Sequence, residues 1–396
     1  MQTSADGFAP SAITSAATGP DKKSDMPRAG FDEVVLLTGF PSFTARKMCE
    51  QLLTSSPRTY VHAVVHPKFD AETRDATGAL DSDARARLNI IEGDAAAMDL
   101  GLSGGEFRSL SREIDRIHHM AQISYLGADR KLAEEVNIGG AHEILEMAAA
   151  CPSLACLVFH STAQVSGDRT GLVLENELDK NQTFRNVVEE SIFRAEKTIR
   201  KAMRQLPICV VRPSIIVGDS RTGEVDRFDG PYFLILLIVT SPPDLPLPLP
   251  GSAETLLHLV PVDYVVRAAC ALGRHARAPG RTFHIGDPSP LSTKRVFELV
   301  ASASGRRTPR GFIPANLTKA LLRTPGIDRF AKSPRAFLDA LATPVTYSYT
   351  STTELLADTD IRCPPFESYV DRVVEYVEHR LREKRARESE VHDPLL

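Results

Sequence analysis

The sequence predicts an α/β fold, a doubly wound parallel sheet with a smaller C-terminal lobe. From residue 31 onward, short apolar runs rich in β-branched residues alternate with longer helical patterns. The first run ends in Gly39, and a helical pattern follows almost at once. The second half is less regular, and the prolines of 241–251 favour neither a helix nor a central strand. Apolar strands that alternate with helices are typical of a parallel sheet with helices on both faces.

The expected elements follow from the apolar periodicity along the chain. Strands are expected at 33–39, 59–66, 87–94, 114–121, 154–162 and 206–214. Helices are expected at 43–55, 129–151, 184–205, 257–274, 293–304 and 364–383. The second of these helices is interrupted near Asn137. The run 233–239 is too short to span a membrane, which takes about 20 residues; it indicates a buried strand or helix, or an apolar pocket wall.

The composition limits the partners, the cellular location and the metal sites that are expected. The 396 residues carry a net charge of -4, which gives no reason to expect nucleic acid or an anionic membrane as a partner. Six cysteines form no CxxC pair and have no histidines at ligand spacing, so we expect a reducing, cytoplasmic location and no metal site.

The turn after the first expected strand reads "TGFPSFTARKM". A dinucleotide-binding turn usually carries three glycines at this point. Here Gly39 occupies the first position, while Ser42 and Ala45 occupy the other two, and Pro41 removes one N–H donor. The helix that follows still offers free amides and the positive end of its dipole to an anion. The sequence therefore predicts a weakened pyrophosphate site, with a purely structural turn as the alternative.

Several further stretches occur in a familiar order. They are "VLLTG", "IEGD", "IHHMAQISY", "VNIGGAHEILEMA", "VFHSTAQVSG", "VVRPSIIVGDSRTGEVD", "LVPVDYVVRAA" and "FHIGDPSPLS". Together they resemble the extended short-chain dehydrogenase/reductases, and within them the thioester reductase and fatty acyl reductase branch. The resemblance covers roughly residues 31–305 and implies a Rossmann fold that binds NAD or NADP.

The resemblance also implies site residues. The cofactor would contact Gly39, Ser42, Phe43, Asp94, Ala95, Ala121, Gln122, Arg212, Pro213 and Ser214. Thr162 matches the Ser/Thr that hydrogen-bonds the substrate carbonyl, and Asn137 matches the helix asparagine that supports proton relay. For the chain as a whole we expect a disordered tail (1–30), a Rossmann NAD(P)-binding core (31–220), a substrate lobe (221–382, with about 255–290 returning to the core) and a charged tail (383–396).

The helix at 184–205 departs from the family pattern. In the family a tyrosine donates a proton to the carbonyl oxygen, and a lysine four residues later supports it. Here Val188 and Ile192 occupy these places, and neither can donate a proton. Candidate replacements are Thr162, His160, Tyr125, His258 and Tyr264.

Three interpretations stay open. The protein transfers hydride from a nicotinamide with another acid, or it is a non-catalytic member that binds a nucleotide or metabolite or scaffolds partners, or it catalyses elimination or isomerisation.

The substrate and cofactor follow by analogy. The branch acts on ketones, aldehydes or thioesters of hydrophobic molecules in lipid or specialised metabolism. The second strand lacks an acidic residue at its end, and His66 and Lys68 lie nearby, which favours NADP over NAD. Many relatives form homodimers through the helices at about 128–150 and 184–205, so a homodimer is expected here.

Overall fold

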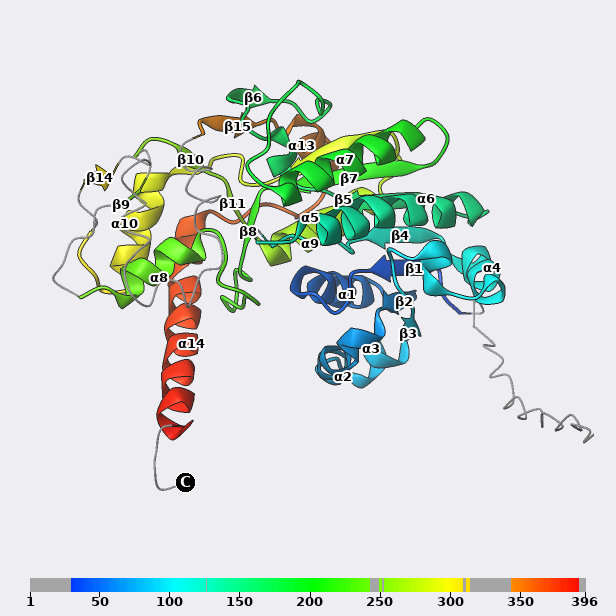
Figure 1. Cartoon of the computed structure of the whole chain (residues 1–396), viewed down its shortest axis with the longest axis horizontal. Coiled ribbons are helices and arrows are strands. Elements are labelled where there is room, and N and C mark those ends of the chain that lie inside the picture. The colour runs from blue at the N-terminus through cyan, green and yellow to red at the C-terminus, as the bar shows by residue number, and fades with distance from the viewer. Residues whose placement is uncertain are drawn as a thin grey trace, which may run out of the picture.

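The computed structural model describes residues 30–125, 127–242, 249–250, 253–308, 311–313 and 343–391. Within them a sheet of parallel strands has the order β12-β7-β5-β4-β1-β2-β3 (Figure 1). The strands are β1 (Glu33–Thr38), β2 (Thr59–Val65), β3 (Leu88–Glu92), β4 (Arg116–His119), β5 (Cys156–His160), β7 (Ile208–Pro213) and β12 (Thr282–Ile285). This confirms the predicted fold class.

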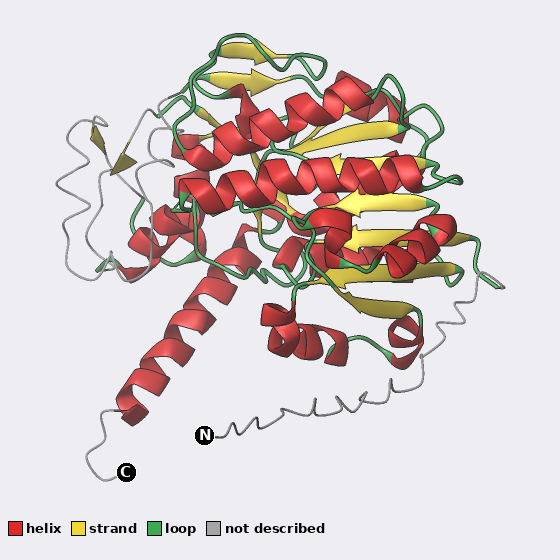
Figure 2. Cartoon of the chain, turned by 45° about the vertical axis from the view of Figure 1, so that its right-hand side comes forward, coloured by secondary structure: helices red, strands yellow, loops and turns green. Residues whose placement is uncertain are grey.

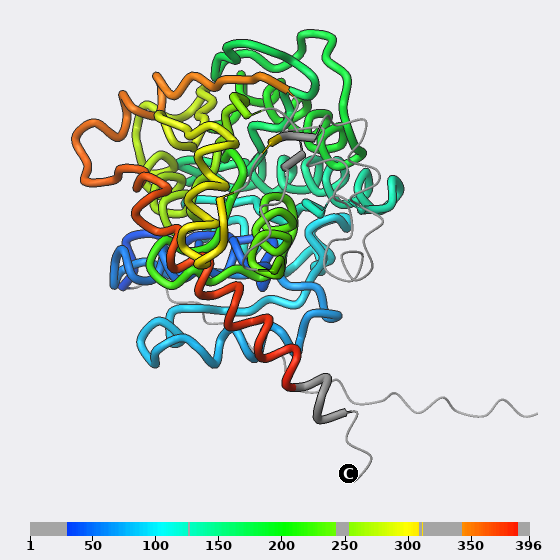
Figure 3. The backbone as a smooth tube through the Cα atoms, turned by 90° about the vertical axis from the view of Figure 1, so that its left-hand side faces the viewer, coloured from blue at the N-terminus to red at the C-terminus, as the bar shows by residue number. Residues whose placement is uncertain are grey.

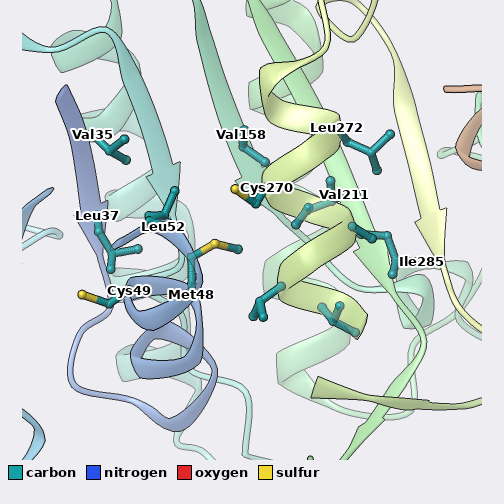
Figure 4. Packing of buried hydrophobic residues seen from close by; sticks show 14 of the residues in the cluster. Val35, Leu37, Met48, Cys49, Leu52, Val158, Val211, Cys270, Leu272 and Ile285 are labelled. Carbon is teal, nitrogen blue, oxygen red and sulfur yellow. The ribbon is translucent and has the colours of Figure 1, made fainter. Parts of the chain in front are cut away.

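Helices cover both faces of the sheet (Figure 2). On one face lie α1 (Phe43–Ser55) and α9 (Val262–Arg274), which contact each other. On the other lie α4 (Gly104–Glu113), α6 (Gly140–Ala150) and α7 (Val187–Ala202). Successive residues of a strand point to opposite faces. Along β1, Val35 and Leu37 pack with the first pair of helices (Figure 4), and Val34 and Leu36 pack with the other three. Burial on both faces explains the uninterrupted apolar run.

Shorter elements connect these layers. They are η1 (Pro67–Phe69), α2 (Asp70–Gly78), α3 (Ser82–Ala86), η2 (Met98–Gly101), α5 (Arg130–Glu134), η3 (Glu135–Gly139), η4 (Ala163–Ser166), β6 (Gly171–Val173), β8 (Ile215–Val217), β9 (Leu249–Pro250), β10 (Leu256–Leu257), β11 (Leu259–Pro261), β13 (Leu291–Ser292), β14 (Phe312–Ile313), β15 (Val345–Tyr347), α13 (Thr350–Leu356) and η5 (Phe366–Ser368).

The strand order places a crevice at the carboxyl end of β1. The chain moves from β1 to β2 and β3 on one side, and returns to β4, β5 and β7 on the other. Loops at such a switch point diverge and leave room for a ligand. The functional site is therefore expected where β1 and β4 end.

A second apolar cluster is built by three helices that lie side by side (Figure 3). It joins α8 (Tyr232–Thr240), α10 (Thr293–Ala303) and the first half of α14 (Val370–Val391). The run 233–239 is thus a helix, and its side chains mainly fill this cluster. In the residues that the structure describes, no helix has the length and apolarity that a bilayer crossing needs.

Some expected boundaries were wrong. The helix expected at 257–274 begins at Val262, because β10 and β11 precede it and Pro261 stands at its N-cap. The last helix begins at Val370 and continues to Val391, so 383–391 of the expected charged tail is helical. A seventh strand, β12, was not expected. The interruption near Asn137 is confirmed as a π-helical turn, η3. The expected tail 1–29 and residues 392–396 lie outside the described residues, and the domain boundaries and the homodimer stay predictions.

Candidate functional site

A pocket of about 980 Å³ lies at the carboxyl ends of the strands. Most of the residues predicted to bind cofactor or substrate line it. They are Gly39, Ser42, Phe43, Asp94, Ala95, Ala121, Gln122, Thr162, Pro213 and Ser214. Asn137 and Arg212 do not line it. These predicted residues therefore lie around one pocket, and the role of each stays a prediction.

The turn between β1 and α1 lines the pocket. Gly39 has φ +88°, and a Cβ at this position would lie 2.5 Å from the backbone of Met120. Only glycine therefore allows β1 and the loop after β4 to approach this closely. Ser42 is the N-cap of α1, and its side chain makes no capping hydrogen bond. Because α1 lacks a side-chain cap, its first amides remain available for an anionic group.

The loop after β4 is hydrogen-bonded to the end of β1. Thr38 Oγ1 accepts hydrogen bonds from Met120 N (3.1 Å) and Ala121 N (3.2 Å). Its own proton is therefore donated to His119 Nδ1, which lies 3.0 Å away. Gln122 continues the loop and donates from Nε2 to the backbone carbonyl of His160. These bonds fix the loop over the carboxyl ends of β1, β4 and β5.

Asn137 positions the same loop from the π-helical turn. Its Oδ1 accepts from Ile123 N at 2.7 Å, and its Nδ2 donates to Ile123 O at 3.1 Å and Ser191 Oγ at 2.9 Å. The side chain is fully buried. These bonds support a positioning role for Asn137, which holds the pocket-lining Ile123 but does not line the pocket itself. Its part in a proton relay stays a prediction.

Asp94 lies at the end of the pocket beyond β3. Its Oδ1 accepts from Ala96 N at 3.0 Å, which shapes the turn. The carboxylate is about half exposed, and His66 Nε2 lies 3.9 Å from it. The side chains of His66 and Lys68 also line this end of the pocket.

Thr162 lies at the opposite end, directly after β5. It is the N-cap of η4, and its Oγ1 accepts from Gln164 N at 3.3 Å. Since the oxygen acts there as an acceptor, its proton remains available to a ligand in the pocket. The neighbouring Ser161 differs, because its Oγ donates to Glu196 Oε2 at 2.6 Å.

Arg212 lies beneath this end and is tied to a buried carboxylate. Its Nε lies 3.0 Å from Glu196 Oε2, and its Nη1 lies 3.3 Å from His284 Nε2. Arg212 and Glu196 are 1% and 0% exposed. The guanidinium thus joins β7 to α7 and supports Pro213 and Ser214 from behind.

The wall formed by α7 is apolar. Val188 and Ile192 pack with Val165 and Phe193 in a small buried cluster. Ile192 lines the pocket, and Val188 is 6% exposed behind it. The positions at which the family carries its proton-donating pair are therefore filled by hydrocarbon.

The candidate replacements fall into two groups. Tyr125, Thr162 and His160 line the pocket, whereas His258 and Tyr264 do not. Burial, with a contribution from the charge of His119, lowers the pKa of His160 to about 3. His160 is therefore neutral near pH 7 and a poor acid. No three histidine, cysteine or carboxylate side chains of the described ranges are grouped to hold a metal ion.

The sequence did not identify a second set of pocket residues. Arg227, Asp229 and Tyr232 line the pocket from the loop that follows β8 and the start of α8. Arg227 contacts Tyr125, which lies far away in the chain. No sequence motif predicts such a contact, because it depends on how the loop folds back over the sheet.

A family model described as "male sterility protein", of the NAD-binding type, matches residues 37–269, more than half of the chain. The chain belongs to this family. The resemblance drawn from the sequence is thereby confirmed.

Several characterised proteins are similar to this family member. Glycine betaine reductase ATRR of Emericella nidulans is 27% identical over 288 residues, 67% of this chain and 22% of that protein. Fatty acyl-CoA reductase wat of Drosophila melanogaster is 24% identical over 293 residues, 63% of this chain and 56% of that protein. This family member thus spans less than two thirds of the length of either relative.

A solved structure shares the fold. It is the terminal R domain from the myxalamid PKS-NRPS biosynthetic pathway, with a TM-score of 0.76 and 23% identity. The match covers 89% of this chain and 92% of that one. At this identity, the likeness concerns the fold.

Proposed function

We propose that this protein is an NAD(P)H-dependent reductase that acts on the carbonyl group of a hydrophobic ketone, aldehyde or thioester. One observation carries the proposal. A single pocket joins an uncapped helix N-terminus at Ser42, suited to a pyrophosphate, with a hydroxyl at Thr162 suited to a carbonyl oxygen. Both relatives described above are named as reductases, which supports the same class of reaction.

The residues present fit a nicotinamide dinucleotide. Ser42 and the first amides of α1 would hold the pyrophosphate, and Asp94 would lie at the adenine end. When bound, such a cofactor supplies a hydride. The chain's own contribution is to orient the carbonyl through Thr162 and to present an apolar surface to the rest of the substrate, to which Ile192, Ile216 and Val217 contribute.

The proton donor of this reductase is atypical. Val188 and Ile192 have no acidic proton, so the proton must come from another wall of the pocket. General acid catalysis raises a reaction rate by roughly 10²–10⁴-fold. Loss of the usual acid therefore slows the reaction without preventing it.

We also propose a preference for NADPH. His66 and Lys68 line the pocket beyond the end of β2, where a ribose 2′-phosphate would lie. Lys68→Glu is expected to weaken NADPH binding by about tenfold or more, since hydrogen bonds to charged groups contribute about 1.5–3 kcal/mol. NADH binding should change little. Lys201→Glu, on the exposed end of α7, is the matched control and should alter neither affinity.

The first test is calorimetric titration of the full chain with NADH and with NADPH. The chain has no tryptophan, so fluorescence transfer from protein is a poor reporter. We expect micromolar binding of at least one cofactor, and a loss of affinity in Ser42→Glu, which places a negative charge at the helix N-terminus. Thr54→Glu, in the last turn of the same helix, is the control. No binding at millimolar cofactor would refute the proposal.

A non-catalytic binding protein is the second candidate. The apolar cluster around Val188 favours it, because loss of cofactor chemistry would leave such a wall. This candidate predicts cofactor or metabolite binding without turnover of any carbonyl compound.

A further inference from the structure

Tyr125 and Arg227 meet at the pocket, on two loops outside α7. We propose that Tyr125 donates the proton in the reduction and that Arg227 is its cationic partner. The inference rests on the proposed function and names the group that replaces the helix tyrosine. The phenol and the cation would then be supplied by two loops, and not by α7 as in the family pattern.

The geometry brings the two groups together with the substrate-binding hydroxyl. Tyr125 lies in the loop after β4, directly beyond Ala121 and Gln122. The guanidinium carbon of Arg227 lies 5.6 Å from the centroid of the Tyr125 ring. Tyr125, Arg227 and Thr162 all line the same pocket. A guanidinium at this distance over an aromatic ring is attracted to its face.

Four other protic side chains of the pocket wall are less suited to the task. Ser161 already donates its proton to Glu196. Tyr232 is 2% exposed, its oxygen accepts from Gly218 N at 2.8 Å, and burial raises its pKa. His160 is neutral, and the aliphatic hydroxyl of Thr162 is a weaker acid than a phenol. Of the pocket-lining tyrosines in the described ranges, Tyr125 is the one that is half-buried and reachable by solvent.

The position of Arg227 is set by ion pairs on its own loop. Glu224 accepts from Lys47 Nζ at 2.7 Å, and Asp226 lies 3.5 Å from Arg46 Nη2, so the loop is tied to α1. The carboxylate of Asp229 lies 3.9 Å from Arg227 Nε. That separation is too long for a hydrogen bond and leaves the guanidinium available to the ring.

The carbonyl carbon receives a hydride from the reduced nicotinamide, and the C=O electron pair moves onto the oxygen. The Oη–H bond of Tyr125 breaks, and its proton goes to that oxygen. The guanidinium of Arg227 stabilises the phenolate that remains. Water then returns a proton to the phenolate, because part of the Tyr125 side chain is exposed to solvent.

The kinetic test uses Tyr125→Phe, which removes the acidic proton and keeps the ring. With 2-octanone and NADPH as probes, turnover should fall about 10²–10⁴-fold, while calorimetric affinity for NADPH stays unchanged. Arg227→Gln should lower turnover less than this, and Arg227→Lys should recover part of that loss. Tyr60→Phe and Arg277→Gln, both outside the pocket, serve as matched controls.

A binding test does not depend on turnover. Calorimetry with 1-octanol, without cofactor, probes a hydrogen bond between the alcohol and Tyr125 Oη. Tyr125→Phe should weaken binding by about 2- to 10-fold, the effect of one neutral hydrogen bond. Tyr60→Phe should leave it unchanged.

The outcomes separate the two proposals. If the wild-type chain binds neither NADH nor NADPH, the proposed function fails. If it binds cofactor and reduces 2-octanone, but Tyr125→Phe turns over at the wild-type rate, the role of Tyr125 is refuted and the reductase stands. If 2-octanone is not reduced, equal 1-octanol affinities in wild type and Tyr125→Phe overturn the role of Tyr125 as well.

Discussion

The two walls of the pocket differ in chemistry, although they face the same space. The loop after β4, together with the residues after β5, presents hydroxyl, amide and phenol groups, among them Gln122, Tyr125 and Thr162. The α7 wall presents Ile192, backed by Val188. At the positions of the family's tyrosine and lysine, α7 thus carries hydrocarbon side chains that cannot donate a proton, whereas the groups named above form a polar wall.

The α7 wall is nevertheless well anchored. Val188, Ile192 and Glu196 are spaced four residues apart, so they follow one another along the same face of the helix. The first two fill an apolar cluster, and the third binds Ser161 and Arg212 beneath the opposite wall. Through Glu196, α7 is therefore bonded to residues that support the polar wall.

Removal of this anchor should have the largest effect. Glu196→Ala leaves the Arg212 guanidinium buried without its carboxylate, and it takes away the acceptor of Ser161. Breaking a buried ion pair in this way costs about 3–5 kcal/mol of unfolding free energy. Urea denaturation measures the loss. Glu190 lies on the same helix as Glu196, and Glu190→Ala breaks an exposed ion pair with Arg130 of α5; it should cost less than about 1 kcal/mol. Equal losses in the two variants would contradict the anchoring role.

The polar wall is tested next through Thr162→Ala. If the Thr162 hydroxyl binds the carbonyl oxygen, turnover of 2-octanone should fall about 10²–10³-fold, as on removal of one donor to a developing oxyanion. Calorimetric affinity for NADPH should not change, because Thr162 follows β5 and Ser42 follows β1, two strands away in the sheet. Thr77→Ala, on α2, is the control. Unchanged turnover would show that the hydroxyl only caps η4.

The apolar wall is tested by restoring the tyrosine. Val188→Tyr forces a ring into the cluster with Val165 and Phe193, and overpacking of this kind costs about 1–3 kcal/mol. Val187→Tyr, at the half-buried neighbouring position, should be tolerated. Urea denaturation of both variants measures the difference. A stable Val188→Tyr protein would mean that the wall has kept room for the original acid.

The sequence predicted where the pocket lies better than it predicted which side chains meet there. Strand–helix alternation and the ordered motifs located the crevice, because apolar strands and Gly39 constrain the backbone locally. The short strand β12 was missed, since its four residues pair with β7 only once the chain returns to the sheet. The Tyr125–Arg227 contact was missed for the same reason. It depends on ion pairs such as Lys47–Glu224, which no local pattern encodes.

The last prediction concerns the histidines beneath the polar wall. Burial lowers the pKa of His119 to about 3, well below the value of about 6.5 in an unfolded chain. The folded state keeps this imidazole neutral, whereas the unfolded state binds a proton below pH 6.5. Its contribution to stability is therefore complete above pH 6.5 and is lost as the pH falls towards 3. Between these limits, each such histidine lowers the unfolding free energy by about 1.4 kcal/mol per pH unit.

His119→Gln isolates this contribution, because an amide oxygen can still accept the hydrogen bond from Thr38. Urea denaturation at pH 7.5, 6 and 5 should show a shallower decline in unfolding free energy than in the wild-type protein. His379→Gln, on the exposed face of α14, should decline as the wild-type protein does. Buried histidines occur on β4 and β5 under the polar wall, whereas the α7 helix contains none. If His119→Gln declines as steeply as the wild type, the acid sensitivity arises elsewhere, and the two walls do not differ in this respect.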